Sequence, residues 1–375
     1  MTMNNQRYKI TTILGTRPEI IRLSEIIKRL DSVSELYVLD TNQNFTSNLN
    51  SEFYKELSIR PPDKTLTAQH STLAGFLANL FIEVEKHLIS HKPDAVLILG
   101  DTNSGLASII CQRLGVPVYH LEAGNRAFDA NVPEELNRKI IDHASLFNLV
   151  YSEHSRRNLL SEGIASRRIS LIGSPLFEVV TSQSKNIESS DILKKLKLVN
   201  EEYFLVSAHR QENVDNEKRL NLLIDSLEAV ARNFGKRIIV STHPRTRSKI
   251  LLLDRKIDHL IEFHDPFGFF DYCKLQSNSK CVISDSGSIS EEAAIIGFKA
   301  VTIRDSMERP EALESGAIVM SGLSPNGLIN ALSSIESSGF PIGKPWEYFV
   351  EDSSSRVVNF IFSTLPVYKT WFGIN

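Results

Sequence analysis

The sequence predicts an α/β protein with two doubly wound domains, each built on a parallel sheet covered by helices. Short apolar runs rich in β-branched residues alternate with segments whose apolar residues recur at helical spacing. The alternation stops at a polar stretch, residues 182–190, and then begins again. A chain of 375 residues is also too long for one ordinary core. Two domains with a cleft between them are therefore expected.

The first half of the chain repeats a unit of strand, turn and helix. An apolar run at residues 8–14 is followed by apolar residues at helical spacing as far as Leu30. The unit recurs at residues 94–99 and again at residues 116–121, after which a helix begins near Pro133. Strands joined by helices pair in parallel, because the connection must return to the starting edge of the sheet.

The second half repeats this pattern and ends in a further helix. Its strands are expected near residues 203–207, 237–241, 260–263, 280–284 and 300–303. Three serines, 353–355, precede apolar positions at helical spacing and predict a capped helix. We expect a Rossmann-like domain at residues 1–178, a second at 179–352, and a C-terminal helical segment, 353–375, that crosses back to the first.

Composition excludes several classes of function. A formal net charge of -3 gives no overall field that would recruit nucleic acid or anionic lipid, so neither is expected as a partner. The three cysteines show no CxxC or Cys/His spacing, which argues against a zinc site or a disulfide framework. The N-terminus has no apolar signal region, and no stretch reaches ~18 apolar residues. A cytoplasmic protein without a bound metal is expected.

A basic cluster follows the first predicted strand, in the segment Gly15-Thr16-Arg17-Pro18-Glu19. Pro18 suits the first position of a helix, which places Arg17 at the helix N-terminus and Arg22 about one turn further on. Guanidinium groups at a helix N-terminus bind anions. A capped helix with solvated charges is the alternative. The glycines of a dinucleotide-binding turn are absent.

Carboxylates follow the next two strands. Asp101 comes directly after the second strand and is either a catalytic group or the N-cap of a helix from Asn103. Glu122 lies where the third strand ends, within His120-Leu121-Glu122-Ala123-Gly124. Glu134 and Arg138 are four residues apart on the following helix, where a plain ion pair would contribute only ~0.3–0.5 kcal/mol.

In the second half, histidines follow two strands and a small-residue turn follows a third. His209, with Arg210, is a candidate acid/base or phosphate-binding residue, and His243 follows the next strand in the same way. The turn at 284–292 offers hydroxyl groups and a close-approaching glycine to a diphosphate, and Glu291 or Glu292 to a ribose. A serine N-cap with acidic residues favoured by the helix dipole is the alternative. Arg304 and Arg309 add cations after the next strand.

Several of these motifs together resemble the non-hydrolysing UDP-N-acetylglucosamine 2-epimerases. In chain order they are Gly15-Thr16-Arg17-Pro18-Glu19, Gly100-Asp101-Thr102, His120-Leu121-Glu122-Ala123-Gly124, Pro133-Glu134-Glu135 with Asn137-Arg138, His209-Arg210-Gln211-Glu212-Asn213, Asp285-Ser286-Gly287 with Glu291-Glu292, and Glu308-Arg309-Pro310-Glu311. The resemblance implies two Rossmann-like domains in the GT-B arrangement, usually as a homodimer, that bind a UDP-activated N-acetyl amino sugar.

The resemblance also implies a mechanism that inverts C2 by elimination of UDP and its re-addition through a 2-acetamidoglycal, with no metal or redox cofactor. By that resemblance Asp101, Glu122, Glu134 and His209 are catalytic. The residues that would bind substrate are Arg17, Arg22, Arg138, His243, Ser286, Gly287, Ser288, Glu292 and Arg309. The sequence leaves open which carboxylate takes the proton.

Finer features are most similar to one branch of the family, which converts UDP-2-acetamido-2,6-dideoxy-L-talose to UDP-N-acetyl-L-fucosamine for capsule or O-antigen synthesis. They are Asn125-Arg126, the short loop to Pro133, the segment 266–272 and Met320-Ser321-Gly322-Leu323. The Thr-Gly-Gln-His segment of the commoner enzymes reads Thr41-Asn42-Gln43-Asn44 here. Activation by a second UDP-sugar, which that segment supports, is therefore not expected.

Other activities remain as alternatives. Two differ only in the sugar: a UDP-N-acetylglucosamine 2-epimerase that makes UDP-N-acetylmannosamine, and a UDP-N-acetyl-L-rhamnosamine 2-epimerase. A GT-B glycosyltransferase would need an acceptor groove with a basic or amphipathic patch, which the first half lacks. A hydrolysing epimerase would release UDP irreversibly, and a nucleotide-sugar sensor would bind without turnover.

Overall fold

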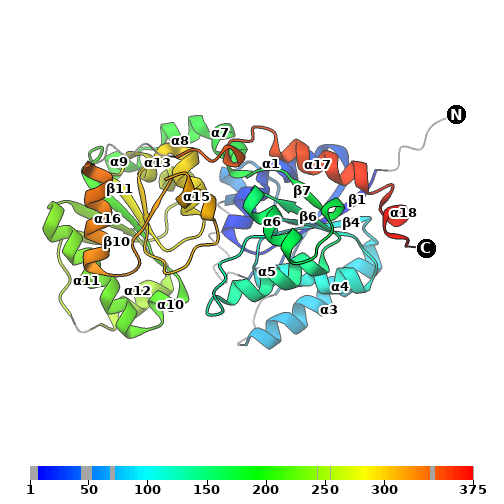
Figure 1. The fold of residues 1–375 in the computed structure, drawn as a ribbon, viewed down its shortest axis with the longest axis horizontal. Coiled ribbons are helices and arrows are strands. Elements are labelled where there is room, and N and C mark those ends of the chain that lie inside the picture. The colour runs from blue at the N-terminus through cyan, green and yellow to red at the C-terminus, as the bar shows by residue number, and fades with distance from the viewer. Residues whose placement is uncertain are drawn as a thin grey trace. The chain divides into compact units, whose positions relative to one another are not determined.

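The computed structural model describes residues 7–43, 53–67, 72–242, 244–253, 255–337 and 343–374. The chain divides into two compact units (Figure 1). One comprises Met1–Val179 with Glu347–Asn375, and the other comprises Val180–Trp346. The expected boundary lay at residue 178, and the return to the first unit begins at Glu347 rather than at residue 353.

The first unit contains a parallel sheet, whose seven described strands run in the order β3-β2-β1-β4-β5-β6-β7. Its strands are β1 (Lys9–Leu14), β2 (Glu35–Asp40), β3 (Lys64–Thr65), β4 (Ala95–Leu99), β5 (Val118–Leu121), β6 (Phe147–Val150) and β7 (Ile169–Leu171). Its helices are α1 (Arg17–Val33), α3 (Leu73–His91), η1 (Asn103–Ala107), α4 (Ser108–Arg113), α5 (Pro133–Ala144), α6 (Glu153–Ser161), η2 (Ser166–Arg168), α17 (Ser353–Thr364) and α18 (Tyr368–Phe372). Two further helices, α7 (Leu176–Ser182) and η4 (Trp346–Tyr348), lie where the chain passes between units.

Both faces of this sheet are covered by helices, which explains why most residues of β1, β4, β5 and β6 are buried. On one face, side chains of α3 and α4 such as Leu80 and Cys111 pack with Ile98 of β4 in one buried cluster. On the other face, α17 contacts α1, and Tyr119 Oη lies 2.7 Å from Thr364 Oγ1 of α17. The C-terminal helix is therefore part of the first unit's core.

The second unit contains another parallel sheet, with its six described strands in the order β10-β9-β8-β11-β12-β13. Its strands are β8 (Tyr203–Ser207), β9 (Arg237–Ser241), β10 (Ile261–His264), β11 (Cys281–Ser284), β12 (Ala300–Thr302) and β13 (Val319–Met320). Its helices are α8 (Ser184–Ser189), α9 (Ile192–Lys195), α10 (Gln211–Val214), α11 (Glu217–Phe234), α12 (Pro244–Leu251), α13 (Phe269–Asn278), α14 (Ile289–Glu292), the π-helix η3 (Ala293–Gly297), α15 (Pro310–Glu314) and α16 (Pro325–Ser337).

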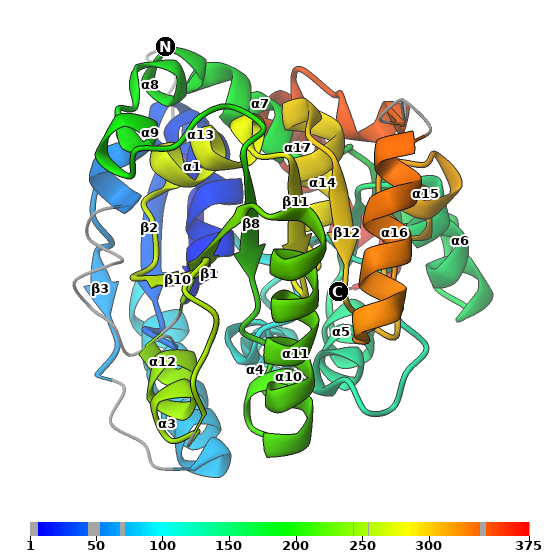
Figure 2. The same cartoon turned by 90° about the vertical axis from the view of Figure 1, so that its left-hand side faces the viewer.

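Helices α11 and α16 lie side by side against one face of this sheet (Figure 2). Leu227 of α11 and Leu332 of α16 pack with Val206, Ile283 and Val301 of the central strands in a buried cluster. On α11 the apolar residues repeat at helical spacing, and its ends are defined by an Asn216 cap and by Gly235 in the left-handed conformation. The two parallel sheets confirm the predicted α/β fold class.

The predicted strands agree with those of the structure to within one or two residues, but the structure shows neither the cap considered for Asp101 nor the serine cap predicted at 353–355. Thr102, not Asp101, occupies the N-cap position of the segment from Asn103, which is a short 3-10 helix. Asp352 precedes α17, and the hydroxyl groups of Ser353 and Ser354 donate hydrogen bonds to Glu178 instead of capping the helix. In both cases a tertiary partner replaces the local backbone as the hydrogen-bonding group.

Candidate functional site

In the first unit, the polar candidates gather at the carboxyl ends of β1, β4 and β5. These strands are neighbours in a parallel sheet, so their carboxyl ends lie at one edge. The carboxyl edge of an open α/β sheet is where ligands bind in such folds.

The turn from β1 into α1 is organised by Glu19, a residue that the sequence analysis did not assign to the site. Glu19 Oε2 accepts hydrogen bonds from the N–H groups of Gly15 (2.6 Å) and Thr16 (2.9 Å). Its Oε1 accepts one from Thr102 Oγ1 at 2.6 Å. Burial raises the pKa of Glu19 to about 7, against these hydrogen bonds, which lower it. One carboxyl group thus ties the turn after β1 to the turn after β4, beside Asp101.

Gly15 allows this turn to approach its neighbours closely. A Cβ at position 15 would lie 2.0 Å from Thr41 Oγ1 and 2.6 Å from Ser104 Oγ. Thr41 Oγ1 and Ser104 Oγ are themselves 2.6 Å apart, and Gln43 Oε1 accepts a hydrogen bond from the Ser104 N–H at 3.2 Å. Gln43 therefore supports the sheet edge from within the first unit. Asn44, which completes the altered segment, lies outside the described residues.

Glu122 has the most unusual backbone among the predicted catalytic residues. Its φ of 64° lies in the left-handed region, which non-glycine residues enter rarely and mostly at functional sites. Its Oε2 is 3.7 Å from the Nε atom of Arg22, and its side chain is 11 % exposed. The structure thus brings together two residues that the sequence placed on different strand ends.

A buried polar network fixes the turn that carries Glu122. The Nδ1 atom of His120 lies 2.8 Å from Asp142 Oδ1, and its Nε2 atom lies 2.8 Å from the carbonyl oxygen of Gly100. Asp142 also pairs with Arg126 at 2.8 Å. Burial alone would raise the pKa of Asp142, but hydrogen bonding from His120 and the charge of Arg126 outweigh it and lower the pKa. The sequence gives no local signal for Asp142, which lies on α5 about twenty residues after His120.

Asp101, which follows β4, forms an ion pair with Arg138 in the middle of α5. The Nδ2 group of Asn137 donates to the carbonyl oxygen of Asp101 at 3.0 Å, which fixes the backbone of that turn. The plain ion pair of Glu134 with Arg138, which was the alternative to a catalytic role for Glu134, is not found. Instead Glu135, which is 5 % exposed, lies 3.8 Å from Arg138. Glu134 is half-buried on the first turn of α5, and its catalytic role stays a prediction.

Arg17 begins α1 at the same edge, where its guanidinium lies over the ring of Phe53 at 5.6 Å. This stacking restrains the side chain at the helix N-terminus. The first unit therefore presents Arg17, Arg22 and Arg138 beside Asp101 and Glu122.

In the second unit, the carboxylate of Asp285 organises the end of β8. It is fully buried and accepts hydrogen bonds from the N–H groups of His209 (3.1 Å) and Arg210 (3.0 Å), and from Asn213 Nδ2 (2.9 Å). The His209 ring, with Nδ1 3.5 Å from Asp285 Oδ1, is 49 % exposed. This arrangement holds the backbone at His209 firmly and leaves its ring accessible. His243 lies outside the described residues.

The turn after β11 is held in place by hydrogen bonds between its own serines and by Arg309. The Oγ atoms of Ser286 and Ser288 are 2.9 Å apart, and the Ser288 N–H donates to Ser286 Oγ at 3.3 Å. Arg309 donates from Nη1 to the carbonyl oxygen of Gly287 (2.9 Å), and its Nη2 lies 2.8 Å from Glu291 Oε1.

A Cβ at position 287 would meet Glu308 Oε1 at 2.1 Å, so any larger residue there would displace the Glu308 side chain. Glu308 in turn pairs with Arg304. Glu291 and Glu292 are the two acidic residues considered for a ribose. Glu291 is fully buried and pairs with Arg309, so it is enclosed by protein. Glu292 is half-buried and accepts a hydrogen bond from Gln276 Nε2 at 2.6 Å. Ligand contacts of Arg309 and Glu292 stay predictions.

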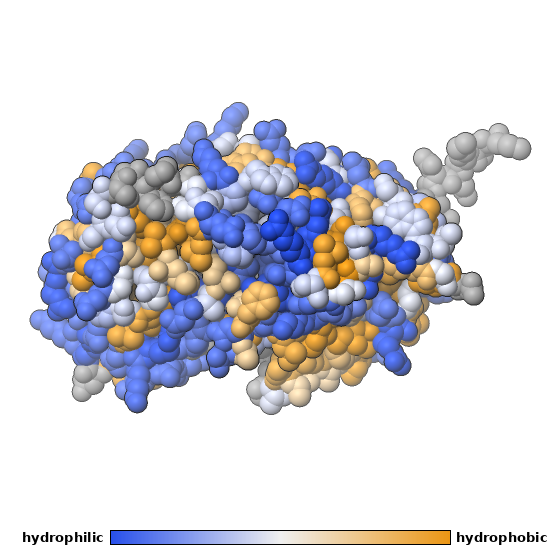
Figure 3. Space-filling view, in the orientation of Figure 1, coloured by the Kyte–Doolittle hydropathy of each residue, from blue (hydrophilic) through white to orange (hydrophobic). Residues whose placement is uncertain are grey.

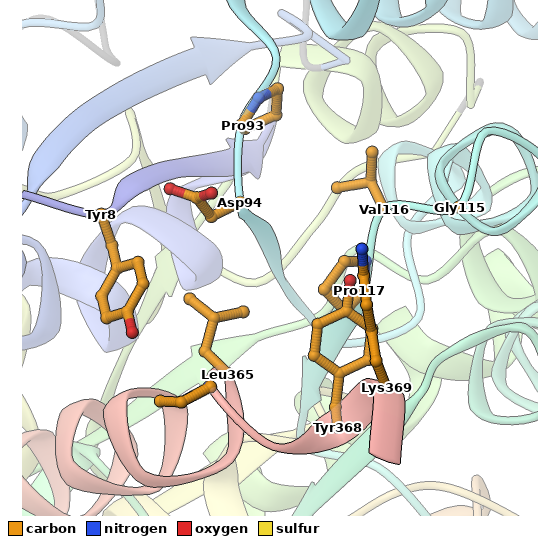
Figure 4. Close-up of a pocket in the computed structure, with 10 residues that line it drawn as sticks. Tyr8, Pro93, Asp94, Gly115, Val116, Pro117, Leu365, Tyr368 and Lys369 are labelled. Carbon is orange, nitrogen blue, oxygen red and sulfur yellow. The ribbon is translucent and has the colours of Figure 1, made fainter. Parts of the chain in front are cut away.

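A separate hollow of about 300 Å³ lies at the opposite edge of the first sheet (Figure 4). Its lining includes Tyr8, Asp94, Leu365, Tyr368 and Lys369. One oxygen of Asp94 accepts a hydrogen bond from the N–H of Lys9 at 2.8 Å. None of the predicted site residues lines this hollow, so the two sites are distinct.

Two features are absent from the residues that the structure describes. None of the helices they form is long and apolar enough to pass through a bilayer. They also contain no group of three or more His, Cys, Asp or Glu side chains arranged to hold a metal ion.

Comparison with known proteins gives a consistent result. Residues 28–362 match the family model described as UDP-N-acetylglucosamine 2-epimerase. A Methanococcus maripaludis protein named UDP-N-acetylglucosamine 2-epimerase is 34% identical over 95% of this chain and 98% of its own length.

Two solved structures are also similar. The UDP-N-acetylglucosamine 2-epimerase from Rickettsia bellii is 37% identical with a TM-score of 0.89, over 98% of this chain and all of that one. The Methanocaldococcus jannaschii UDP-GlcNAc 2-epimerase, solved in complex with UDP-GlcNAc and UDP, is 33% identical with a TM-score of 0.87, over 95% and 99% of the two chains.

Proposed function

Because the chain belongs to the UDP-N-acetylglucosamine 2-epimerase family, we propose that it inverts C2 of a UDP-activated N-acetyl amino sugar, and specifically converts UDP-2-acetamido-2,6-dideoxy-L-talose to UDP-N-acetyl-L-fucosamine for capsule or O-antigen synthesis. The general activity, that of a UDP-sugar 2-epimerase, follows from membership of the family, and such enzymes are isomerases. The observation that carries the proposal is the set of carboxylates and guanidinium groups at the carboxyl edge of the first sheet, above all Glu122 beside Arg22.

The chemistry requires elimination because the proton at C2 is not adjacent to a carbonyl group. As C2 loses its proton to a carboxylate, the C1–O bond breaks and its electron pair leaves with UDP, which forms a C1=C2 double bond. Protonation of C2 from the opposite face and return of the UDP oxygen to C1 then give the epimer. The step needs acid/base groups and cationic stabilisation of the departing diphosphate.

The first unit supplies the groups proposed to act on the sugar. Asp101, Glu122 and Glu134 are the candidates for proton transfer and for stabilising positive charge that develops at C1. The ion pair of Asp101 with Arg138 and the proximity of Glu122 to Arg22 fix the positions of two of these carboxylates. Fixed donors and acceptors cost no reorganisation during the reaction, which is the main advantage of such an arrangement.

The second unit supplies the groups proposed to hold UDP. The hydroxyl groups of Ser286 and Ser288 and the backbone at Gly287 suit a diphosphate, and Glu292 suits a ribose hydroxyl. The exposed ring of His209 is a candidate to contact the diphosphate. Arg309, which donates to the carbonyl oxygen of Gly287, would keep this turn in shape.

The choice of sugar is supported by sequence features that resemble the fucosamine branch, including the buried residues Asn125 and Arg126. The names of the relatives favour a second candidate, a UDP-N-acetylglucosamine 2-epimerase. Proton NMR of the protein incubated in D2O with each sugar separates the two. Deuterium at C2 with formation of UDP-N-acetyl-L-fucosamine supports the first, and exchange only with UDP-N-acetylglucosamine supports the second. No exchange with either would reject both.

We also propose that the protein is a homodimer that associates through α3 and α4. Helix α3 has a second apolar face besides the one that packs on the sheet, and Figure 3 shows an apolar area over α3 and α4. Leu73, Ile82 and Ile89 of α3 and Leu114 at the end of α4 are between 43% and 61% exposed. A large exposed apolar surface on a folded protein typically marks an interface.

A further inference from the structure

We propose that Phe128 determines specificity for a 6-deoxy sugar, by packing its ring against the methyl group at C6 of the substrate. The inference rests on the proposed function. It depends on three features of Phe128: its exposure, its backbone conformation and the anchoring of the loop around it.

Phe128 is the aromatic residue of the loop between β5 and α5, and 75% of its surface is accessible. An exposed phenylalanine ring does not make the contribution to folding stability that its burial would provide. Its φ is 54°, in the left-handed region, where a bulky residue without a local hydrogen-bonding group is a genuine outlier. Exposure of the ring and the positive φ of the residue each lower the stability of the folded protein. Their presence together therefore points to a role in contacting a ligand.

The loop on both sides of Phe128 is anchored. Before it, the Arg126 side chain is 1% exposed and pairs with Asp142 and with Glu162, and the Ala127 N–H donates to Glu135 Oε2 at 2.8 Å. After it, Asp129 Oδ1 accepts hydrogen bonds from the N–H and the side-chain amide of Asn131, at 2.9 and 2.8 Å.

These contacts fix the position of the backbone that bears the exposed ring. An aromatic residue held in advance in this way loses little conformational entropy when a ligand packs against it.

The position of the loop relates Phe128 to the sugar. Phe128 lies on this loop six residues after Glu122, which follows β5, and six residues before Glu134 on the first turn of α5. A sugar whose C2 lies near these carboxylates would have the rest of its ring within reach of the loop. An aromatic face accommodates a methyl group well, whereas a hydroxymethyl group there would lose hydrogen bonds to water. The ring therefore suits a sugar with a methyl group at C6.

The test compares two substrates that differ only at C6: UDP-2-acetamido-2,6-dideoxy-L-talose and its analogue with a hydroxymethyl group in place of the methyl group. kcat/KM for each is measured by C2 deuterium exchange in the intact protein, in Phe128→Ala and in Phe128→Gly. Glycine adopts a positive φ without strain, so Phe128→Gly should not lower the unfolding temperature. The matched control is Leu136→Ala, which truncates another exposed apolar side chain, on α5.

We expect the unmodified protein to prefer the methyl sugar, and both Phe128 variants to lose about 10- to 100-fold of that preference, the range expected for one small apolar group. Leu136→Ala should keep the preference. An unchanged preference in the Phe128 variants, or an equal loss for both substrates, would overturn the role of Phe128 while leaving the proposed function intact. Turnover of UDP-N-acetylglucosamine alone by the unmodified protein would overturn both.

Discussion

The substitution Glu19→Gln tests whether the buried Glu19 carboxyl group stabilises the turn between β1 and α1. The quantity to measure is the free energy of unfolding as a function of pH. Burial raises the pKa of Glu19 from its ordinary 4.5 to about 7. The folded protein therefore binds this proton more tightly than the unfolded chain does. The stability that the protonated group provides is complete below pH 4.5 and is lost as the pH rises to about 7. Since each pH unit is worth about 1.4 kcal/mol, the total change is roughly 3 kcal/mol.

Glutamine preserves the contacts without the titration. Its carbonyl oxygen can accept from the N–H groups of Gly15 and Thr16, and its amide group can donate to Thr102 Oγ1. We expect the stability of Glu19→Gln relative to the unmodified protein to increase by roughly 3 kcal/mol between pH 4.5 and pH 8. With about 2–4 °C per kcal/mol for a domain of 150–250 residues, this is a relative increase in unfolding temperature of roughly 6–12 °C.

The assay is thermal unfolding followed by circular dichroism at closely spaced pH values, and Thr102→Val serves as a matched variant. It removes a hydrogen bond that lowers the pKa of Glu19, so the loss of stability should extend to higher pH. In the Glu19→Gln background the same change should not alter the pH dependence. Parallel stability curves for Glu19→Gln and the unmodified protein would refute the reasoning.

Three further predictions concern catalysis, the nucleotide turn and assembly. Glu122→Gln should reduce turnover by orders of magnitude and leave UDP binding, measured by calorimetry, largely intact; near-normal turnover would remove Glu122 from the catalytic set. Arg309→Met should cost about 3–5 kcal/mol in urea unfolding, because it leaves the fully buried Glu291 without this cation, and adding Glu291→Gln should recover part of the loss. Ile82→Glu with Ile89→Glu should shift a dimer to monomer in sedimentation velocity, and an unchanged dimer would place the interface elsewhere.

The fold class followed from the sequence because local pattern and global topology agree. Buried parallel strands are apolar on both faces, and the helices that cover them are apolar on one face. The alternation of continuous apolar runs with helical spacing therefore predicted the sheets. Strands β2, β3, β6, β7 and β13 were not predicted. Of these, β3 and β13 have two residues each and β7 has three, which is too short to show a periodicity. The motifs also placed Asp101 and Glu122 at strand ends, which in a parallel sheet share one edge.

Tertiary structure decided which groups support the site. Asp142 binds His120 and Arg126 from a helix distant in sequence, and Glu19 joins two separate turns. Such pairings depend on where elements pack, and no spacing along the chain encodes them. Spacing along α5 allowed Arg138 to pair with Glu134 (i, i+4) or with Glu135 (i, i+3), and the structure places Glu135 near it. The sequence determined the chemistry available at the sheet edge, and packing determined which side chains face it, because burial selects partners by distance in space.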